Sequence, residues 1–238
     1  MNIAYTVFHS DNYADSSLLN RKNNVESIHA EFGKSFEYID NDVYIVKNFI
    51  DYKNIIKKNL DLRKIKIKGS FRFGAVGLIM TTFLAYRKML NSNNDIFLIF
   101  EDDAQLSPNA IDLVKQILDE LPDDFDILSM YDNKAFHYKY NKKHDCGLQN
   151  ICLSYNDRST LVYAISKNGI KKYLKYMENI VDAPIDVYLF DENKDTAKYA
   201  IKPKSSKPFY SDFFVENGDP DYENSSINKT EEFFFKYA

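Results

Sequence analysis

Short apolar runs alternate with amphipathic segments along the chain, and this order predicts an α/β protein. Apolar runs rich in β-branched and aromatic residues predict strands at 3–8, 36–39, 43–46, 96–100, 125–130, 159–166 and 199–201. Apolar residues at helical spacing predict helices at about 15–32, 48–60, 75–90, 108–121 and 170–177, with a short one near 183–189. Strands that alternate with helices are typical of a sheet flanked by helices, which is the fold class we expect.

The strongest strand is the apolar run Ile96–Phe100, which we expect to be buried on both faces. Three carboxylates follow it directly: Glu101, Asp102 and Asp103. Adjacent negative charges repel one another and are costly to bury, so a divalent cation with oxygen ligands would stabilise them. Because side chains alternate along a strand, Glu101 and Asp103 should share one side and hold the metal, while Asp102 meets a different partner.

A second interpretation of the same triplet stays open at this point. Carboxylates are favourable near a helix N-terminus, so the three residues could form a solvated acidic turn before the next helix. That helix is predicted to begin at Ser107 and Pro108, with the serine as N-cap and the proline in the first turn. The position of the triplet at the end of a strand favours a ligand site, because open α/β sheets bind ligands there.

Composition excludes only a few classes of protein. The chain has 238 residues, 45% of them apolar, a net charge of −4 and two cysteines. These values suit one large domain, here residues 1–208, with a C-terminal extension at 209–238, and they exclude a disulfide scaffold. We see no signal peptide and no apolar run of the roughly 20 residues that span a bilayer. A cytoplasmic protein is expected, with peripheral attachment to a membrane surface left open.

The segment Lys53–Arg72 carries the strongest local charge bias, with eight basic residues and one acid. Lysines that alternate with isoleucines at 64–68 indicate a half-exposed strand, where lysine blocks pairing between sheet edges. The alternative is a surface for an anionic partner, either an acidic acceptor, anionic lipid or nucleic acid. The negative total charge does not favour nucleic acid.

Three single residues have a functional and a structural interpretation each. Arg21 could meet a phosphate or lie on a solvated helix face, and Gly77 could admit a ligand or a packed backbone. Asp186 could be a general base or a favourable charge in the first turn of a short helix. The spacing of His144, Cys146 and Cys152 does not match a zinc site well.

Four stretches together resemble glycosyltransferase family 25, whose members include lipooligosaccharide-type sugar transferases. The similarity covers 73–77 with the following helix, the strand end 98–104, the strand and glycine-bearing helix start 161–169, and the Pro-x-Asp element at 184–186. It extends over about residues 1 to 205, and the order of the motifs carries it. Thr81 and Thr82 stand where the family usually has a Ser-His pair, which puts any role of that histidine in doubt.

The resemblance implies a GT-A fold with a Rossmann-like mixed sheet, and a metal-dependent, inverting transfer of sugar from a nucleotide-diphosphate sugar, with UDP expected. Mn²⁺ or Mg²⁺ would be held by Glu101 and Asp103, and Asp186 would be the catalytic base. The donor would contact residues at four positions, namely Asp102, Arg21, Gly77 and Tyr163. Two alternatives remain: a Mg²⁺-dependent phosphoryl-transfer enzyme, and a GT-A-like binding protein without activity. The acceptor, a glycan or another hydroxylated and anionic molecule, cannot be read from the residues.

Overall fold

The computed structural model describes residues 2–10, 18–131, 134–154, 160–192, 195–203, 205–210 and 232–236. The first residues of the helix predicted at 15–32, Ser159 of a predicted strand, and most of the predicted C-terminal extension lie outside these ranges. No helix in the described part of the chain is long and apolar enough to cross a membrane.

Seven strands form the central sheet: β1 (Ile3–Phe8), β2 (Glu37–Tyr38), β4 (Ile96–Glu101), β6 (Ile127–Ser129), β7 (Ile151–Leu153), β8 (Val162–Ser166) and β9 (Lys198–Ile201). Their order is β2-β1-β4-β8-β6-β9-β7. The sheet is mixed, because β4 is parallel to β1 and antiparallel to β8. The α/β class with a mixed central sheet is therefore confirmed.

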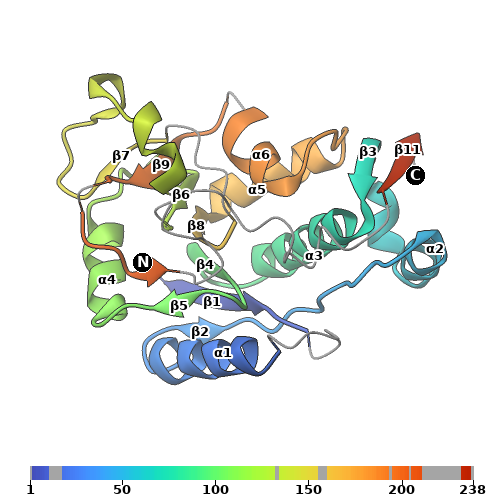
Figure 1. Cartoon of the computed structure of the whole chain (residues 1–238), viewed down its shortest axis with the longest axis horizontal. Helices are drawn as coiled ribbons and strands as arrows, with labels where there is room; N and C mark the ends of the chain where they lie inside the picture. The colour runs from blue at the N-terminus through green and yellow to red at the C-terminus, as the bar shows by residue number, and fades with distance from the viewer. Residues whose placement is uncertain are drawn as a thin grey trace.

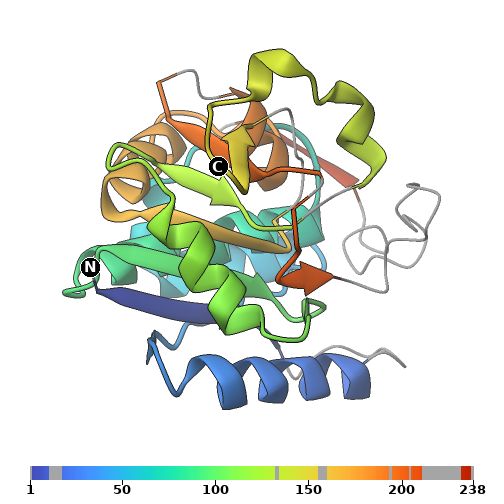
Figure 2. The ribbon, with the colours of Figure 1, turned by 90° about the vertical axis from the view of Figure 1, so that its left-hand side faces the viewer.

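The described residues form six α-helices: α1 (Leu18–Phe32), α2 (Phe49–Lys58), α3 (Phe73–Leu90), α4 (Ala110–Asp119), α5 (Lys167–Met177) and α6 (Ile185–Val187). Figure 1 shows α3 and α5 on one side of the sheet and α4 on the other. The hydrophobic core is divided in the same way, since residues of α3, α5 and α6 pack in one cluster and residues of α1 and α4 in another. Figure 2 looks onto the side that carries α4, with α1 as a separate layer below the strands.

Strand β4 contributes side chains to both clusters, one from each face, as its apolar run predicts. Phe97 and Ile99 belong to the cluster with α3, and Ile96, Leu98 and Phe100 belong to the cluster with α1 and α4. All five are at most 3% exposed. Because both faces of β4 are buried, its carboxyl end is held rigidly, and the three carboxylates that follow have a fixed starting direction.

Four shorter helical segments lie between these elements in the described part of the chain. A 3₁₀ helix, η1 (Leu60–Lys64), comes after α2, and two more, η2 (Lys134–Lys139) and η3 (Lys142–His144), precede β7. A π-helical turn, η4 (Tyr188–Glu192), continues α6. Asn48 caps α2 by accepting from the backbone N–H groups of Ile50 and Asp51, which agrees with the helix predicted at 48–60.

Residues 69–74, which lie outside the strands and helices predicted above, belong to a strand and a helix. β3 (Lys68–Arg72) pairs antiparallel with β11 (Glu232–Lys236), and α3 begins directly at Phe73. The alternating segment before β3 keeps its predicted burial, because Ile65 and Ile67 are buried and the lysines beside them are exposed. The division into residues 1–208 and 209–238 stays a prediction, although β11 adds a strand next to β3.

Two further local predictions are wrong. The segment 43–46 has no strand structure and instead lies against α3. Ser107 does not cap α4, because its hydroxyl donates to the carbonyl oxygen of Lys207 at 2.6 Å, and its N–H donates to that of Pro208 at 2.9 Å. The helix begins at Ala110 behind Asn109, which has a φ of 61°. A small sheet of β5 (Gln105–Leu106) and β10 (Phe209–Tyr210) lies beside this turn.

Candidate active site

The three carboxylates lie at the carboxyl end of β4, in a buried setting rather than in solvent. Asp102 is 2% exposed, and Glu101 and Asp103 are partly buried. The next helix, α4, begins only at Ala110. The interpretation as a solvated acidic turn at a helix N-terminus is therefore wrong, and the triplet occupies the edge of the sheet where α/β proteins bind ligands.

Asp102 faces α1 and the end of β1. Its Oδ1 accepts a hydrogen bond from Nη1 of the buried Arg21, and its Oδ2 lies 3.1 Å from Nδ1 of His9. Asn24 donates to the backbone oxygen of Asp102 at 3.3 Å. These contacts compensate the buried charge of Asp102, as buried carboxylates require. Arg21 thus anchors Asp102, and direct contacts of either residue with a donor stay predictions.

The side chain of Glu101 instead contacts the residues that lead into β8. Its Oε1 accepts a hydrogen bond from the hydroxyl of Thr160, just before β8. Burial raises the pKa of Glu101 above its usual value, and the negative charges of Asp103, Asp102 and Asp186 raise it further, while the Thr160 hydrogen bond opposes them. The carboxylates are close enough to repel one another, so a positive charge would be strongly favoured between them.

Asp103 provides the clearest sign of a missing partner. Its Oδ1 is buried and has no hydrogen-bond partner among the described residues. Burial is the largest cause that raises its pKa, followed by the charge of Asp102, and Arg21 partly offsets both. A buried carboxylate oxygen without a donor is costly, so the site calls for a cation or a ligand.

Glu101 and Asp103 have the oxygen atoms that Mn²⁺ and Mg²⁺ prefer, so these two residues fit a divalent ion. They do not make a complete centre, because no group of three or more His, Cys, Asp and Glu side chains within the described ranges could hold a metal ion alone. An ion at this site would take its other ligands from water and from a bound phosphate. That division is the usual one for Mg²⁺ beside phosphorylated substrates.

Asp186 lies in α6, and its negative charge is the smallest of the contributions that raise the pKa of Glu101. The turn η4, which follows α6, is hydrogen-bonded to α5. The hydroxyl of Tyr173 donates to the carbonyl oxygen of Leu189 at 2.5 Å. This bond joins α5 to η4, three residues after Asp186.

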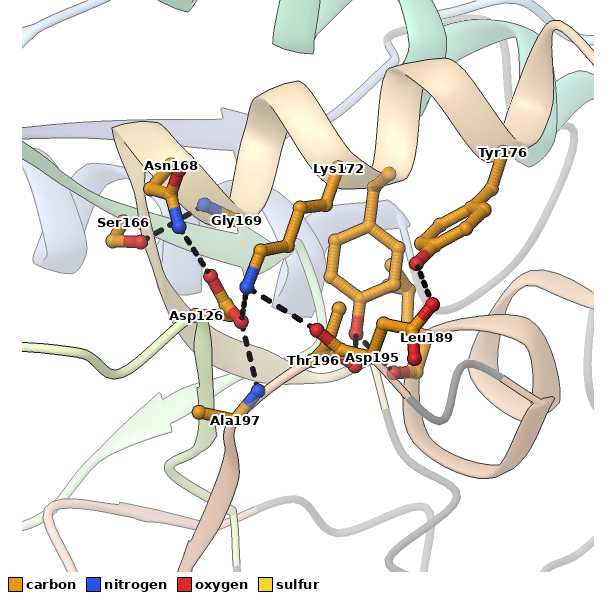
Figure 3. Close-up of polar contacts among 11 residues, drawn as sticks. Asp126, Ser166, Asn168, Gly169, Lys172, Tyr176, Leu189, Asp195, Thr196 and Ala197 are labelled. Atoms are coloured by element: carbon orange, nitrogen blue, oxygen red, sulfur yellow. Dashed lines mark hydrogen bonds and ion pairs between the residues drawn. The ribbon is translucent and has the colours of Figure 1, made fainter.

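A buried aspartate, Asp126, lies just before β6 and links α5 to the residue that precedes β9. It accepts hydrogen bonds from Lys172 Nζ at 2.5 Å, from Asn168 Nδ2 at 3.0 Å and from the backbone N–H of Ala197 at 2.8 Å (Figure 3). Gly169 is required here, because a Cβ would come within 2.3 Å of the Asp126 carbonyl oxygen. The glycine-bearing helix start is thus explained by packing, and Asp126 has a structural role.

Gly77 and Tyr163, two predicted donor-binding positions, are both buried. A Cβ on Gly77 would come within 2.3 Å of the carbonyl oxygen of Tyr44, so the close approach it allows is that of a backbone. Thr81, one turn further along α3, accepts from the N–H of Tyr44 at 2.9 Å. The hydroxyl of Tyr163 lies 3.1 Å from that of Tyr86. Their contacts with a donor stay predictions.

The cysteines play no part in the cluster. Cys146 and Cys152 are free thiols, and burial raises the pKa of Cys152 to about 12. The Cys152 thiol donates to the carbonyl oxygen of Ala200 at 3.4 Å. The expectation that His144 and the two cysteines do not form a zinc site stays a prediction.

His9 and Thr160 are contacts of the triplet that the sequence reasoning missed. A signal for His9 exists, because β1 and β4 are parallel and Phe8 pairs with Glu101. The residue after each strand therefore lies beside the other, which places His9 next to Asp102. Thr160 has no comparable signal, because a loop positions it before β8.

The fold and the site together define an α/β protein with a carboxylate cluster at the end of its central strand. The sequence model of glycosyltransferase family 25, described as an LPS biosynthesis protein, matches residues 16–211. The chain therefore belongs to glycosyltransferase family 25 and is a glycosyltransferase. A mixed central sheet flanked by helices, which the resemblance implies, is observed.

Individual proteins and solved structures resemble this chain only at low sequence identity. A protein of Haemophilus influenzae named "Putative glycosyltransferase" is 25% identical over 208 residues, which cover 86% of this chain and 71% of that protein. Among solved structures, A197 from STIV has a TM-score of 0.41 and 13% identity, with 85% of this chain and 83% of that chain covered. A Drosophila β1,4-galactosyltransferase 7 mutant in complex with manganese, UDP-Gal and xylobiose has a TM-score of 0.35 and 13% identity, with 72% and 51% covered.

Proposed function

We propose that this glycosyltransferase transfers a sugar from a nucleotide-diphosphate sugar, with UDP as the expected nucleotide, to an acceptor hydroxyl with inversion at the sugar. The observation that carries the proposal is the pair Glu101 and Asp103, with the buried and unpartnered Oδ1 of Asp103. The pair would hold Mn²⁺ or Mg²⁺ against the diphosphate of the donor. When bound, the ion supplies the positive charge that stabilises the departing diphosphate.

The chain's own residues supply the rest of the reaction. Asp186 is the proposed base, and its carboxylate takes the proton of the acceptor hydroxyl as the acceptor oxygen bonds to the sugar carbon. The bond from that carbon to the diphosphate breaks on the opposite face, which inverts the configuration. Arg21 and His9 hold Asp102, so that the neighbouring Glu101 and Asp103 keep their direction.

A donor screen tests this function directly. The purified protein is incubated with Mn²⁺ and a panel of nucleotide sugars, and mass spectrometry detects release of the nucleoside diphosphate. Wild-type protein should hydrolyse or transfer from at least one donor, and Asp103→Asn should lose this activity. Asp119→Asn serves as the matched control, because Asp119 is an exposed carboxylate on α4. Equal turnover by Asp103→Asn and wild type would overturn the proposed role of the pair.

A further inference from the structure

A basic surface outside the carboxylate cluster is formed by α2, η1 and the residues that lead into β3. Its members are all exposed and comprise Lys53, Lys57, Lys58, Arg63, Lys64, Lys66 and Lys68. The two acids within residues 49–68 are both engaged, since Asp51 accepts from the N–H of Lys47 and Asp61 pairs with Lys64 and Arg87. Figure 1 shows α2 at one end of the molecule, where α3 begins beside β3.

Two exposed apolar side chains accompany this charge. Ile50 is 71% exposed and Leu60 is 67% exposed, one at the start of α2 and one at the start of η1. Ile50, Lys53 and Lys57 recur at helical spacing, so they share the outer face of α2. The inner face is anchored in the core by Tyr52, which is 5% exposed. The outer face is therefore held rigidly while it presents both lysines and aliphatic groups.

We propose that the outer face of α2, with η1, docks on a bilayer surface that contains anionic phospholipids. The lysines match the negative headgroups, and basic residues near such a surface attract it individually. Ile50 and Leu60 would enter the boundary between headgroups and acyl chains, which is where the apolar groups of surface-bound helices lie. The proposal does not depend on the proposed reaction, because it uses none of the residues of the carboxylate cluster.

The exposed apolar groups favour a bilayer over nucleic acid and acidic glycans as the anionic partner. Nucleic acid and acidic glycans are bound by basic groups together with hydrogen-bonding or aromatic side chains on which bases stack. The strongly exposed apolar residues of this surface are aliphatic, and its nearest aromatic, Phe49, is partly buried beneath the ammonium of Lys53 at 4.4 Å. An aliphatic group gains from leaving water only where an apolar phase is available.

Co-sedimentation of the whole protein with vesicles tests the proposal. The vesicles consist of phosphatidylcholine alone, or of phosphatidylcholine with about a third phosphatidylglycerol. Binding is expected only to the second kind, and it should weaken as the salt concentration rises. Binding to neither kind, or equally to both kinds, would overturn the proposal. So would tighter binding to duplex DNA than to the anionic vesicles under the same salt.

Variants separate this surface from charge elsewhere. The double variant Lys53→Gln with Lys57→Gln should weaken partition into the anionic vesicles roughly 30-fold, because each lysine contributes separately. Ile50→Ser with Leu60→Ser should weaken it as well, with little change in salt dependence. The matched control is Lys142→Gln with Lys143→Gln, two exposed lysines of η3. A control that loses as much binding as the α2 variant would contradict the proposed surface, and circular dichroism confirms that each variant is folded.

Discussion

Arg21 donates a hydrogen bond from Nη1 to Oδ1 of Asp102, although the two residues are 81 positions apart and both are buried. The bond ties α1 to the end of the central strand. It also gives the middle residue of the acidic triplet a structural role, so that Glu101 and Asp103 are the two carboxylates proposed to hold the metal ion. This division of roles is what the following predictions examine.

Removal of one partner of this ion pair should destabilise the protein strongly. Arg21→Met leaves the charge of Asp102 buried, with His9 as its remaining side-chain partner among the described residues, so we expect a loss of about 3–5 kcal/mol in the free energy of unfolding. The double variant Arg21→Met with Asp102→Leu removes both charges and should cost clearly less than the sum of the single variants. Urea unfolding of all four proteins measures the coupling. Additive effects would show that the two groups do not interact.

The crowded carboxylates should make the metal-free protein less stable as pH rises. The pKa of Glu101 is raised in the folded state, so the folded protein binds more protons than the unfolded chain above the ordinary pKa of 4.5. Stability is therefore present at low pH and is lost as pH rises through the raised pKa. Glu101→Gln should exceed wild type by at least about 1.4 kcal/mol at high pH, the equivalent of one pKa unit.

Thermal unfolding across a pH series, with a chelator present, checks this prediction. The advantage of Glu101→Gln should vanish at low pH, where the wild-type carboxyl group is protonated in both states. Added Mn²⁺ should stabilise wild type and reduce the difference. A variant that is less stable than wild type at every pH would contradict the repulsion that involves Asp102, Asp103 and Asp186.

Gly77→Ala should destabilise the protein by about 1–3 kcal/mol, because the new Cβ would overlap the Tyr44 carbonyl oxygen. The backbone of both elements would have to shift, since a Cβ would lie 2.3 Å from that oxygen. Gly147→Ala is a useful comparison, because it has a φ of +81° and nothing within 4 Å of the new group. Chemical denaturation should show the larger loss for Gly77→Ala. An equal or smaller loss would mean that α3 does not pack this closely.

Tyr173→Phe should weaken the support of the turn that follows Asp186. Loss of the hydroxyl leaves the carbonyl oxygen of the buried Leu189 without this donor, which costs about 1–3 kcal/mol. We also expect kcat to fall more than KM for the donor changes, because the base and not the donor site is displaced. Tyr176→Phe is the control, since its hydroxyl meets Asp195 only at 3.5 Å and near the surface. Equal kinetics for wild type and Tyr173→Phe would refute the positioning role.

Local patterns predicted the elements whose signals lie within a few residues. β4 was predictable because five consecutive apolar residues are buried on both faces, and α3 and β1 for comparable reasons. The errors occur where a distant segment decides the structure. β3 contains a glycine and reads as a loop, yet it pairs with β11 near the other end of the chain. Ser107 looks like an N-cap, but its hydroxyl is taken by the carbonyl oxygen of Lys207.

The candidate active site was likewise only partly predictable from local sequence patterns. The triplet itself was visible in the sequence, because three acids after a buried strand are electrostatically unusual. Its partners were not, since Arg21, His9 and Thr160 come from three other parts of the chain, and even the position of His9 follows only once β1 and β4 are known to pair. The unpartnered oxygen of Asp103 could be found only from the packing around it.

The account rests on a divalent ion held by Glu101 and Asp103, and Mn²⁺ binding measures this most directly. Electron paramagnetic resonance of Mn²⁺ in the presence of UDP reports the bound ion without any need for turnover. Wild type should bind Mn²⁺, Asp103→Asn should bind it at least about tenfold more weakly, and Asp119→Asn should match wild type. Wild-type affinity in Asp103→Asn, or no binding by wild type, would contradict the account.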